Sequence, residues 1–283
     1  MYLSGIADEA GKPIGTQIRA HCELGWKHVE IRNVAGVNLA SPDMPETTFE
    51  AIRERVTEAG LQVSCFASEL ANWARPISGD FQLDVDQLRT AIPRMHKCGT
   101  EFIRTMSWPN DSDNPLSDDD WRDEAISRMR ELATIAEDGG VTLVHENCSG
   151  WGGRGPEQSM RLLEAVGSDR LKFVFDTGNT LGHGQDPWEY YQGVKDHVVY
   201  VHIKDRQRSD GKEQACYCGE GDARVRDILT DLYAAGYRGG VSIEPHLAAA
   251  VHLGKEAEDD AAYRIYVEYG RRMTRIVEEI TGG

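Results

Sequence analysis

Four strand-like segments in the second half of the sequence each end in a side chain that can bind a metal ion or move a proton. The apolar run LKFVFD ends in Asp176, and similar runs before and after it end in Glu146, His202 and Glu244. Successive members of this set are separated by roughly the length of one strand and one helix. If the strands are parallel neighbours, their carboxyl ends lie at one face and the four side chains converge.

Three carboxylates at the end of a buried sheet would repel one another and lose their hydration. A divalent cation would offset both costs, and this donor set suits Mn²⁺, Mg²⁺ or Co²⁺ without excluding Zn²⁺. We therefore predict one divalent metal ion, with Mn²⁺ as the expected ion, bound by Glu146, Asp176, His202 and Glu244. Taken alone, each residue could instead be a polar strand end that hydrogen-bonds to a loop.

A repeated pattern of helix, glycine and strand supports the parallel arrangement. Several times the chain passes from a segment with helical periodicity, through a glycine, to a short β-branched run. Glycine suits the left-handed residue that ends many helices. The predicted strands lie near residues 2–7, 28–33, 62–67, 101–107, 141–146, 171–176, 198–204 and 240–244.

Eight strands separated by helix-sized segments predict an α/β fold, a closed (β/α)8 TIM barrel with right-handed crossovers. An open doubly wound sheet is the alternative, but SGIADEAGK lacks the G-x-G-x-x-G phosphate turn. No linker or low-complexity tract divides the chain, so we expect a single domain over residues 1–283. The irregular segment from Pro245 to Ala262 could be a lid, a subunit contact or a surface loop.

The composition restricts the class of partner. A formal net charge of −16 opposes a phosphate backbone and argues against nucleic acid. No run approaches the roughly 20 apolar residues of a membrane span, and the first residues lack the features of a signal peptide. We expect a cytoplasmic protein that binds a small molecule and no membrane, with a homo-oligomer or a partner subunit left open.

The strand ends also carry recognisable motifs. In chain order they are HEN at 145–147, FDTGN at 175–179, VHIKD at 201–205, GEGD at 219–222 and SIEPH at 242–246. They resemble the sugar isomerase and epimerase superfamily with xylose-isomerase-like barrels. The resemblance covers essentially the whole chain, and it is most specific in the last four strands. It implies a sugar or cyclitol substrate and metal binding by the same four strand-end residues.

The resemblance also implies a chemistry. In the ketose 3-epimerases two metal-binding glutamates form the acid/base pair, a role that falls here to Glu146 and Glu244. A cation chelated by a carbonyl and its neighbouring hydroxyl acts as a Lewis acid and stabilises the enediolate that forms when the α-proton leaves. A second group returns the proton, which gives epimerisation or isomerisation. We therefore expect a metal-dependent carbohydrate isomerase or epimerase.

Departures from the family pattern bear on substrate binding. The ketose 3-epimerases usually have a histidine three residues after the sixth-strand aspartate, where this chain has Asn179. Its amide can hydrogen-bond a substrate but cannot transfer a proton. Arg208 matches the family's arginine six residues after the seventh-strand histidine, and we expect it to contact a substrate oxygen. Lys204 raises the possibility of an anionic substrate.

Three further residues complete the predicted site. His145 and His246 flank the two glutamates, and a histidine beside a metal is a competent acid or base. We assign His145 to catalysis and His246 to substrate binding, with a structural role as the alternative for both. Trp108 ends the fourth strand, where it could stack on a sugar ring or pack in the core.

Other functions stay open. Inosose dehydratases and the barrel subunits of C-glycoside deglycosidases remove a proton next to a ketone and expel the β-substituent, and the IEPH motif resembles theirs. A lyase acting on a 3-keto sugar or keto-inositol is therefore one alternative, and a non-catalytic sugar-binding protein or partner subunit is another. The endonuclease IV group uses further histidine ligands on early strands, where this chain has Glu30, Arg32 and Glu69.

Overall fold

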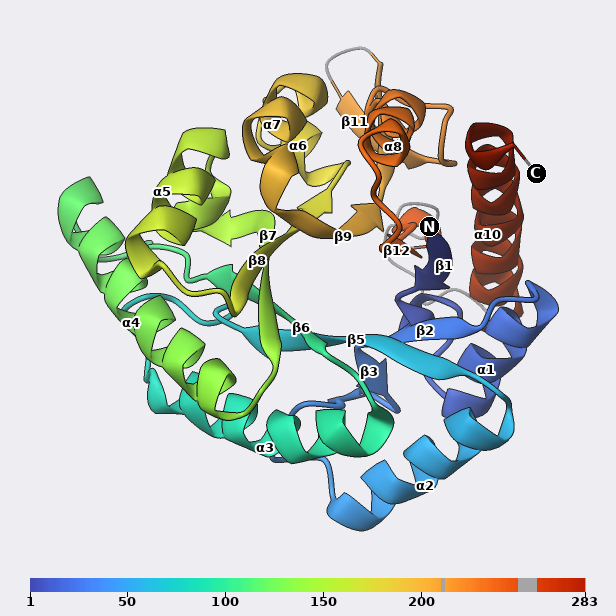
Figure 1. The fold of residues 1–283 in the computed structure, drawn as a ribbon, viewed down its shortest axis with the longest axis horizontal. Coiled ribbons are helices and arrows are strands. Elements are labelled where there is room, and N and C mark those ends of the chain that lie inside the picture. Colours follow the sequence, from blue (N-terminus) through green and yellow to red (C-terminus); the bar gives the residue numbers. More distant parts are fainter. Residues whose placement is uncertain (210–211, 249–258, 283) are drawn as a thin grey trace.

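Eight parallel strands form the barrel that the sequence predicted (Figure 1). The computed structural model describes residues 1–209, 212–248 and 259–282. The barrel strands are β1 (Tyr2–Gly5), β2 (His28–Ile31), β5 (Gln62–Leu70), β6 (Phe102–Ser107), β7 (Thr142–Gly150), β8 (Leu171–Asp176), β9 (Val198–Ile203) and β12 (Gly240–Ile243).

Neighbouring barrel strands follow one another in sequence, which is usual for parallel strands joined by helices. Their order is β1, β12, β9, β8, β7, β6, β5 and β2. A parallel bridge between Ile6 and Glu30 connects the two ends of this order and closes the barrel. Because all strands run the same way, their carboxyl ends open at one common face.

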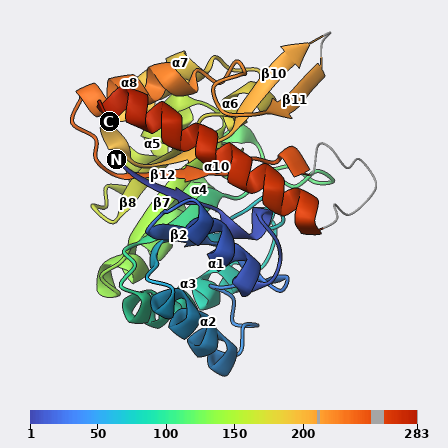
Figure 2. The same ribbon diagram turned by 90° about the vertical axis from the view of Figure 1, so that its right-hand side faces the viewer.

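Helices surround the barrel and provide the crossovers. The C-terminal helix packs against the first and eighth helices, and Figure 2 shows it lying across the outside of the barrel. No helix within the described ranges is long and apolar enough to cross a lipid bilayer. The helices are α1 (Ile14–Glu23), α2 (Glu46–Glu58), α3 (Gln82–Cys98), α4 (Asp118–Asp138), α5 (Pro156–Val166), α6 (Asn179–Gly182), α7 (Pro187–Val194), α8 (Val225–Ala234) and α10 (Asp259–Thr281), with short 3-10 turns at η1 (Ala7–Glu9), η2 (Trp151–Gly153) and η3 (Lys195–His197).

Helices of the barrel end at glycines, as predicted. Gly99 and Gly167 end α3 and α5 with left-handed φ values of 66° and 67°. These values explain why glycine is suited to both positions, since a Cβ atom disfavours this conformation. After α4, Gly140 adopts the left-handed conformation, and the preceding Gly139 does not.

Inside the barrel an apolar layer lies beneath a charged one. Alternate side chains of a strand point to the same side, so residues two apart stack along the barrel axis. The apolar layer includes a small buried cluster of Cys65, Val144, Val174 and Tyr200. Two residues further along the last three of these strands stand Glu146, Asp176 and His202.

The boundaries differ from the prediction at the carboxyl ends of the strands. β5 and β7 run past the predicted ends at residues 67 and 146, and their pairing with β6 shifts register there. Two antiparallel hairpins also follow barrel strands. Most of the predicted irregular segment from Pro245 to Ala262 lies outside the described residues, and α10 begins within it at Asp259. The hairpins are β3 (Asn33–Val34) with β4 (Val37–Asn38), and β10 (Asp205–Ser209) with β11 (Lys212–Cys216).

Candidate metal centre and active site

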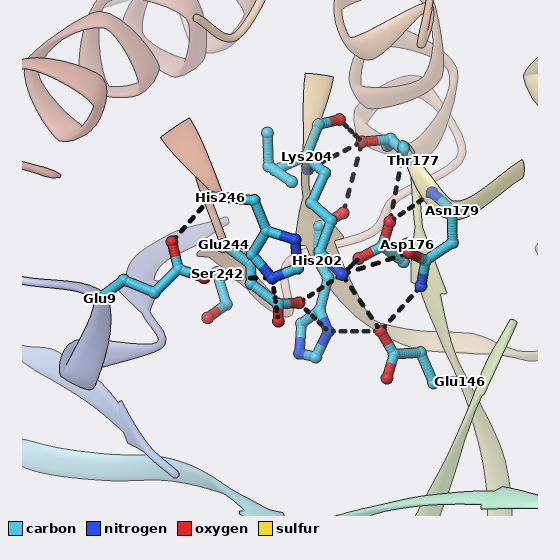
Figure 3. Close-up of polar contacts among 12 residues, drawn as sticks. Glu9, Glu146, Asp176, Thr177, Asn179, His202, Lys204, Ser242, Glu244 and His246 are labelled. Carbon is cyan, nitrogen blue, oxygen red and sulfur yellow. Dashed lines mark hydrogen bonds and ion pairs between the residues drawn. The ribbon is translucent and has the colours of Figure 1, made fainter. Parts of the chain in front are cut away.

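The four predicted metal-binding side chains converge inside the barrel (Figure 3). Glu146, Asp176, His202 and Glu244 are all buried, and each offers one ligand atom within 4.8 Å of the others. The His202 Nδ1 atom lies 3.3 Å from Glu146 Oε1 and 3.8 Å from Glu244 Oε2. Three carboxylates and an imidazole at this spacing fit a divalent cation.

Local contacts aim Asp176 into this group. Its Oδ1 atom accepts the backbone N–H groups of Gly178 and Asn179, at 2.9 and 2.8 Å, in the turn that ends β8. The side chain of Asn147 donates to the Asp176 carbonyl and accepts its N–H. Oδ2 accepts no hydrogen bond of good geometry and faces the site. Gly178 is needed because a Cβ atom there would lie 2.5 Å from Lys204 Cβ.

The Lys204 ammonium lies among the carboxylates (Figure 3). Its Nζ atom is 2.8 Å from Glu244 Oε2, 3.1 Å from Asp176 Oδ2 and 4.0 Å from Glu146 Oε1. It also donates to Asn179 Oδ1 at 3.2 Å. Burial would lower the pKa of Lys204, but the surrounding carboxylates raise it well above its ordinary value. Lys204 is therefore charged, and it would compete with a metal ion for the same oxygens.

Arg104 is a member of the site that the sequence analysis missed. Its buried guanidinium places Nη1 3.4 Å from Glu146 Oε2, and Nη2 donates to the Ser68 carbonyl at 3.1 Å. Burial would raise the pKa of Glu146, but the neighbouring cations, Arg104 foremost, lower it to about 2. The sequence did indicate this residue, because an arginine within the predicted barrel strand FIRTMS is expected to be buried and paired with an acidic group.

Basic side chains also hold Glu244 in place. Arg32 Nη1 lies 2.9 Å from Glu244 Oε1, and His246 Nε2 lies 3.1 Å from the same oxygen. Burial would raise the pKa of Glu244, but Lys204 and these two neighbours lower it well below its ordinary value. His246 has a left-handed φ of 52°, and its backbone N–H donates to Glu9 Oε2 at 2.8 Å. This contact fixes the imidazole beside Glu244.

A cavity of about 440 Å³ opens onto the metal centre. Its size is that of a small-molecule site. Asn179, Lys204 and His246, which we predicted to bind substrate, all line it. Asn72 and Trp73, which follow β5, form part of the far wall, and the Trp73 side chain is 71% exposed. This wall could not be predicted from the sequence, because no local pattern marks a loop that faces a cavity.

The catalytic role predicted for His145 is wrong. Neighbouring residues of a strand point to opposite sides, so His145 faces the helices while Glu146 faces the barrel axis. His145 is fully buried, and its ring lies 5.8 Å from that of Phe173 and packs against Gly152. Burial lowers the pKa of His145 to about 4, so the imidazole is neutral.

Two predicted substrate contacts are also corrected. Trp108 is fully buried, and its indole N–H donates to Asp84 Oδ2 at 2.7 Å, so it presents no face to a sugar. Arg208 lies on the β10 strand and is not among the residues that line the cavity. Its guanidinium donates to the Leu181 carbonyl and to Glu213 Oε1, both at 2.9 Å.

A comparison with protein families agrees with the fold and with these motifs. The family described as "Xylose isomerase-like TIM barrel" matches residues 18–265. The chain belongs to this family. The match includes all four strands whose ends form the candidate metal centre.

Sequence relatives include inosose dehydratases. The inosose dehydratase of Lacticaseibacillus casei is 24% identical over 144 residues, which cover 46% of this chain and 48% of that protein. The matched segments span less than half the length of the first curated relatives.

Solved structures share the fold over the full length. The IOLI protein with a bound zinc atom superposes with a TM-score of 0.76 at 14% identity, covering 99% of both chains. A D-psicose 3-epimerase solved in the presence of D-fructose gives a TM-score of 0.74 at 14% identity, covering 100% of both chains.

The burial of Trp108 leads to a prediction about stability. Trp108→Phe removes the donor to Asp84 and leaves a buried carboxylate oxygen without that partner. We expect the free energy of unfolding to fall by about 1–3 kcal/mol, while metal affinity stays unchanged. Urea denaturation measures the first quantity and calorimetric titration the second. Trp73→Phe, at an exposed position, serves as the control and should change neither. A loss of metal affinity without a loss of stability would contradict the core assignment.

The position of Lys204 leads to a prediction about metal binding. Lys204→Met preserves most of the side-chain volume but removes the ammonium. We expect metal binding to become roughly tenfold tighter or more, since an ammonium and a cation a few ångströms apart repel each other. Isothermal titration with Mn²⁺ and with Zn²⁺ measures the change. Arg208→Met removes a cation outside the cavity and should leave the affinity unchanged. Weaker binding by Lys204→Met would show that the ammonium supports the metal rather than competing with it.

Proposed function

We propose that this protein is a metal-dependent enzyme that removes a proton next to the carbonyl of a sugar or cyclitol. The observation that carries the proposal is the convergence of Glu146, Asp176, His202 and Glu244 beside a cavity of small-molecule size. Membership of the xylose isomerase-like family supports it, as do relatives named as a dehydratase and an epimerase of polyhydroxylated substrates.

We propose Mn²⁺ as the ion, with Mg²⁺, Co²⁺ and Zn²⁺ as alternatives. The four converging residues would hold it, and when bound it supplies Lewis-acid stabilisation of negative charge on substrate oxygens. The lowered pKa values of Glu146 and Glu244 keep both carboxylates ionised at neutral pH, as a proton acceptor must be. The bound zinc of the IOLI protein shows that a neighbour in fold accepts a divalent metal.

Lys204 and Asn179 are placed to stabilise the negative charge that develops on a substrate oxygen during proton removal. Each lines the cavity next to the ligand carboxylates, so each can donate a hydrogen bond to a substrate oxygen. An ammonium in a buried cavity stabilises an oxygen that becomes negative as the proton leaves. Lys204 therefore contributes most after proton removal, when the substrate has become anionic.

The cavity favours a neutral substrate. Three cations line it, namely Arg32, Arg104 and Lys204, and each already faces carboxylates of the protein. Among the described residues of the far wall, Asn72 and Trp73 offer an amide and an aromatic ring. This chemistry suits hydroxyl groups and the apolar face of a sugar ring, and it does not provide a phosphate site.

Isomerisation or epimerisation is the first outcome we propose, and elimination is the second. One observation favours elimination. The His246 imidazole lines the cavity beside Glu244, and although burial would lower its pKa, Glu244 and Glu9 raise it. A protonated imidazole there can donate a proton to a leaving hydroxyl group, which a lyase acting on a keto-inositol or 3-keto sugar requires.

Hydrogen exchange and product analysis distinguish these outcomes. The Mn²⁺-loaded protein is incubated in deuterated water with ketoses, a keto-inositol and a 3-keto glucoside, and the products are followed by NMR. Exchange of a carbon-bound hydrogen without bond cleavage indicates isomerisation or epimerisation, whereas release of water or of the aglycone indicates elimination. We expect Glu146→Gln and Glu244→Gln each to slow the reaction at least about 100-fold.

Glu69→Gln is the control for these variants, because Glu69 lines the cavity away from the ligand group. If the metal-loaded wild-type protein exchanges no hydrogen of any of these substrates, the enzymatic proposal is wrong. The alternative of a non-catalytic sugar-binding protein or partner subunit then stands.

The exposed indole of Trp73 leads to a prediction about substrate affinity. Trp73→Ala removes a stacking face at the cavity rim, far from the reacting atoms. The substrate and the transition state should therefore lose the same binding free energy. We expect KM to rise roughly three- to tenfold with kcat nearly unchanged, as for the loss of about 1 kcal/mol of stacking. Leu116→Ala, an exposed apolar residue outside this cavity, is the control. A fall in kcat at constant KM would place Trp73 at the reacting centre instead.

A further inference from the structure

We propose that Glu30 is a positioning residue that sets the tautomer and the ring orientation of His202, so that Nδ1 faces the metal centre. This inference rests on the proposed metal-binding function. It concerns a residue of the second strand, which is not part of the ligand group and does not line the cavity.

Glu30 makes polar contacts with His202 and Ser242 inside the barrel. The residue is fully buried on β2, and its Oε1 atom lies 3.2 Å from His202 Nε2. Its Oε2 atom accepts the Ser242 hydroxyl at 2.6 Å. Ser242 stands opposite His202 in the pairing of β12 with β9, so Ser242 braces Glu30 beside the imidazole.

The two imidazole nitrogens of His202 face carboxylates of different kinds. Nε2 lies 3.2 Å from Glu30 Oε1, outside the ligand group, whereas Nδ1 faces two of the proposed metal ligands, Glu146 Oε1 at 3.3 Å and Glu244 Oε2 at 3.8 Å. A cation held by those ligands would replace the proton on Nδ1, while Glu30, which can only accept a hydrogen bond, would keep the proton on Nε2. The ring also meets Tyr200 edge-on at 5.8 Å, but an aromatic contact does not distinguish the two nitrogens. Glu30 therefore provides the chemical distinction between them.

The cost of burying Glu30 supports a functional role. A carboxylate removed from water destabilises the fold unless it is well paired. Burying an apolar side chain in the barrel interior would cost less free energy. Within the described residues, the closest partners of Glu30 are a histidine and a hydroxyl group, and no arginine or lysine forms an ion pair with it. A carboxylate in this position strengthens the His202 Nε2–H bond and makes Nδ1 a better ligand.

The test is metal binding by Glu30→Gln, which retains the size of the side chain but removes its charge. We expect the affinity for Zn²⁺, measured by calorimetric titration, to fall roughly 10- to 100-fold. The nitrogen NMR signals of His202 in the Zn²⁺-loaded wild-type protein should show a protonated Nε2 and a metal-bound Nδ1, and this pattern should be lost or mixed in the variant. Glu69→Gln, a carboxylate that touches none of the ligands, should match the wild type.

Ser242→Ala provides a second variant, because it removes the hydroxyl that braces Glu30 while the carboxylate remains. We expect a smaller loss of Zn²⁺ affinity than for Glu30→Gln. If Glu30→Gln fails to fold by circular dichroism, Ser242→Ala decides the question. Wild-type Zn²⁺ affinity and an unchanged His202 tautomer in the folded variant would overturn the inference. Absence of Zn²⁺ binding by the wild-type protein would instead overturn the proposed function.

Discussion

The mutual repulsion of buried carboxylates is the constraint on which the site depends. Several acidic side chains meet within a few ångströms of His202, and all of them are buried. Their charges are tolerable only because cations arrive from other strands, and a buried carboxylate deprived of its partner would be strongly destabilising. The opposing groups are the carboxylates of Glu146, Asp176 and Glu244 and the cations Arg32, Arg104 and Lys204.

The barrel makes this concentration of charge possible. Parallel strands bring their carboxyl ends to one face, and the two-residue period places a polar layer directly above an apolar one. The apolar layer, with Tyr200 and Val174, excludes water from below, so each ion pair acts in a low dielectric. The same burial that makes the charges costly therefore makes them effective toward a substrate.

Lys204 links the stability of the site to its chemistry. Its ammonium neutralises the oxygens of Glu244 and Asp176 that a metal ion would also bind. Once a cation takes over that role, the ammonium is available to an oxygen of the substrate. With Lys204, which lines the cavity, the charges of the site would be balanced both without a metal ion and with the proposed one.

The sequence by itself determined the barrel and the four strand ends, because both follow from local periodicity and from the parallel direction of neighbouring strands. The same two-residue period could also have excluded His145, which points opposite to Glu146. Only the tertiary structure decided which other residues join the site. Asp84 of α3 binds the indole of Trp108, and Arg208, on the hairpin after β9, contacts Leu181 and Glu213 and does not line the cavity. Glu30 meets His202 across the barrel, and no local pattern records a contact between segments so far apart in the chain.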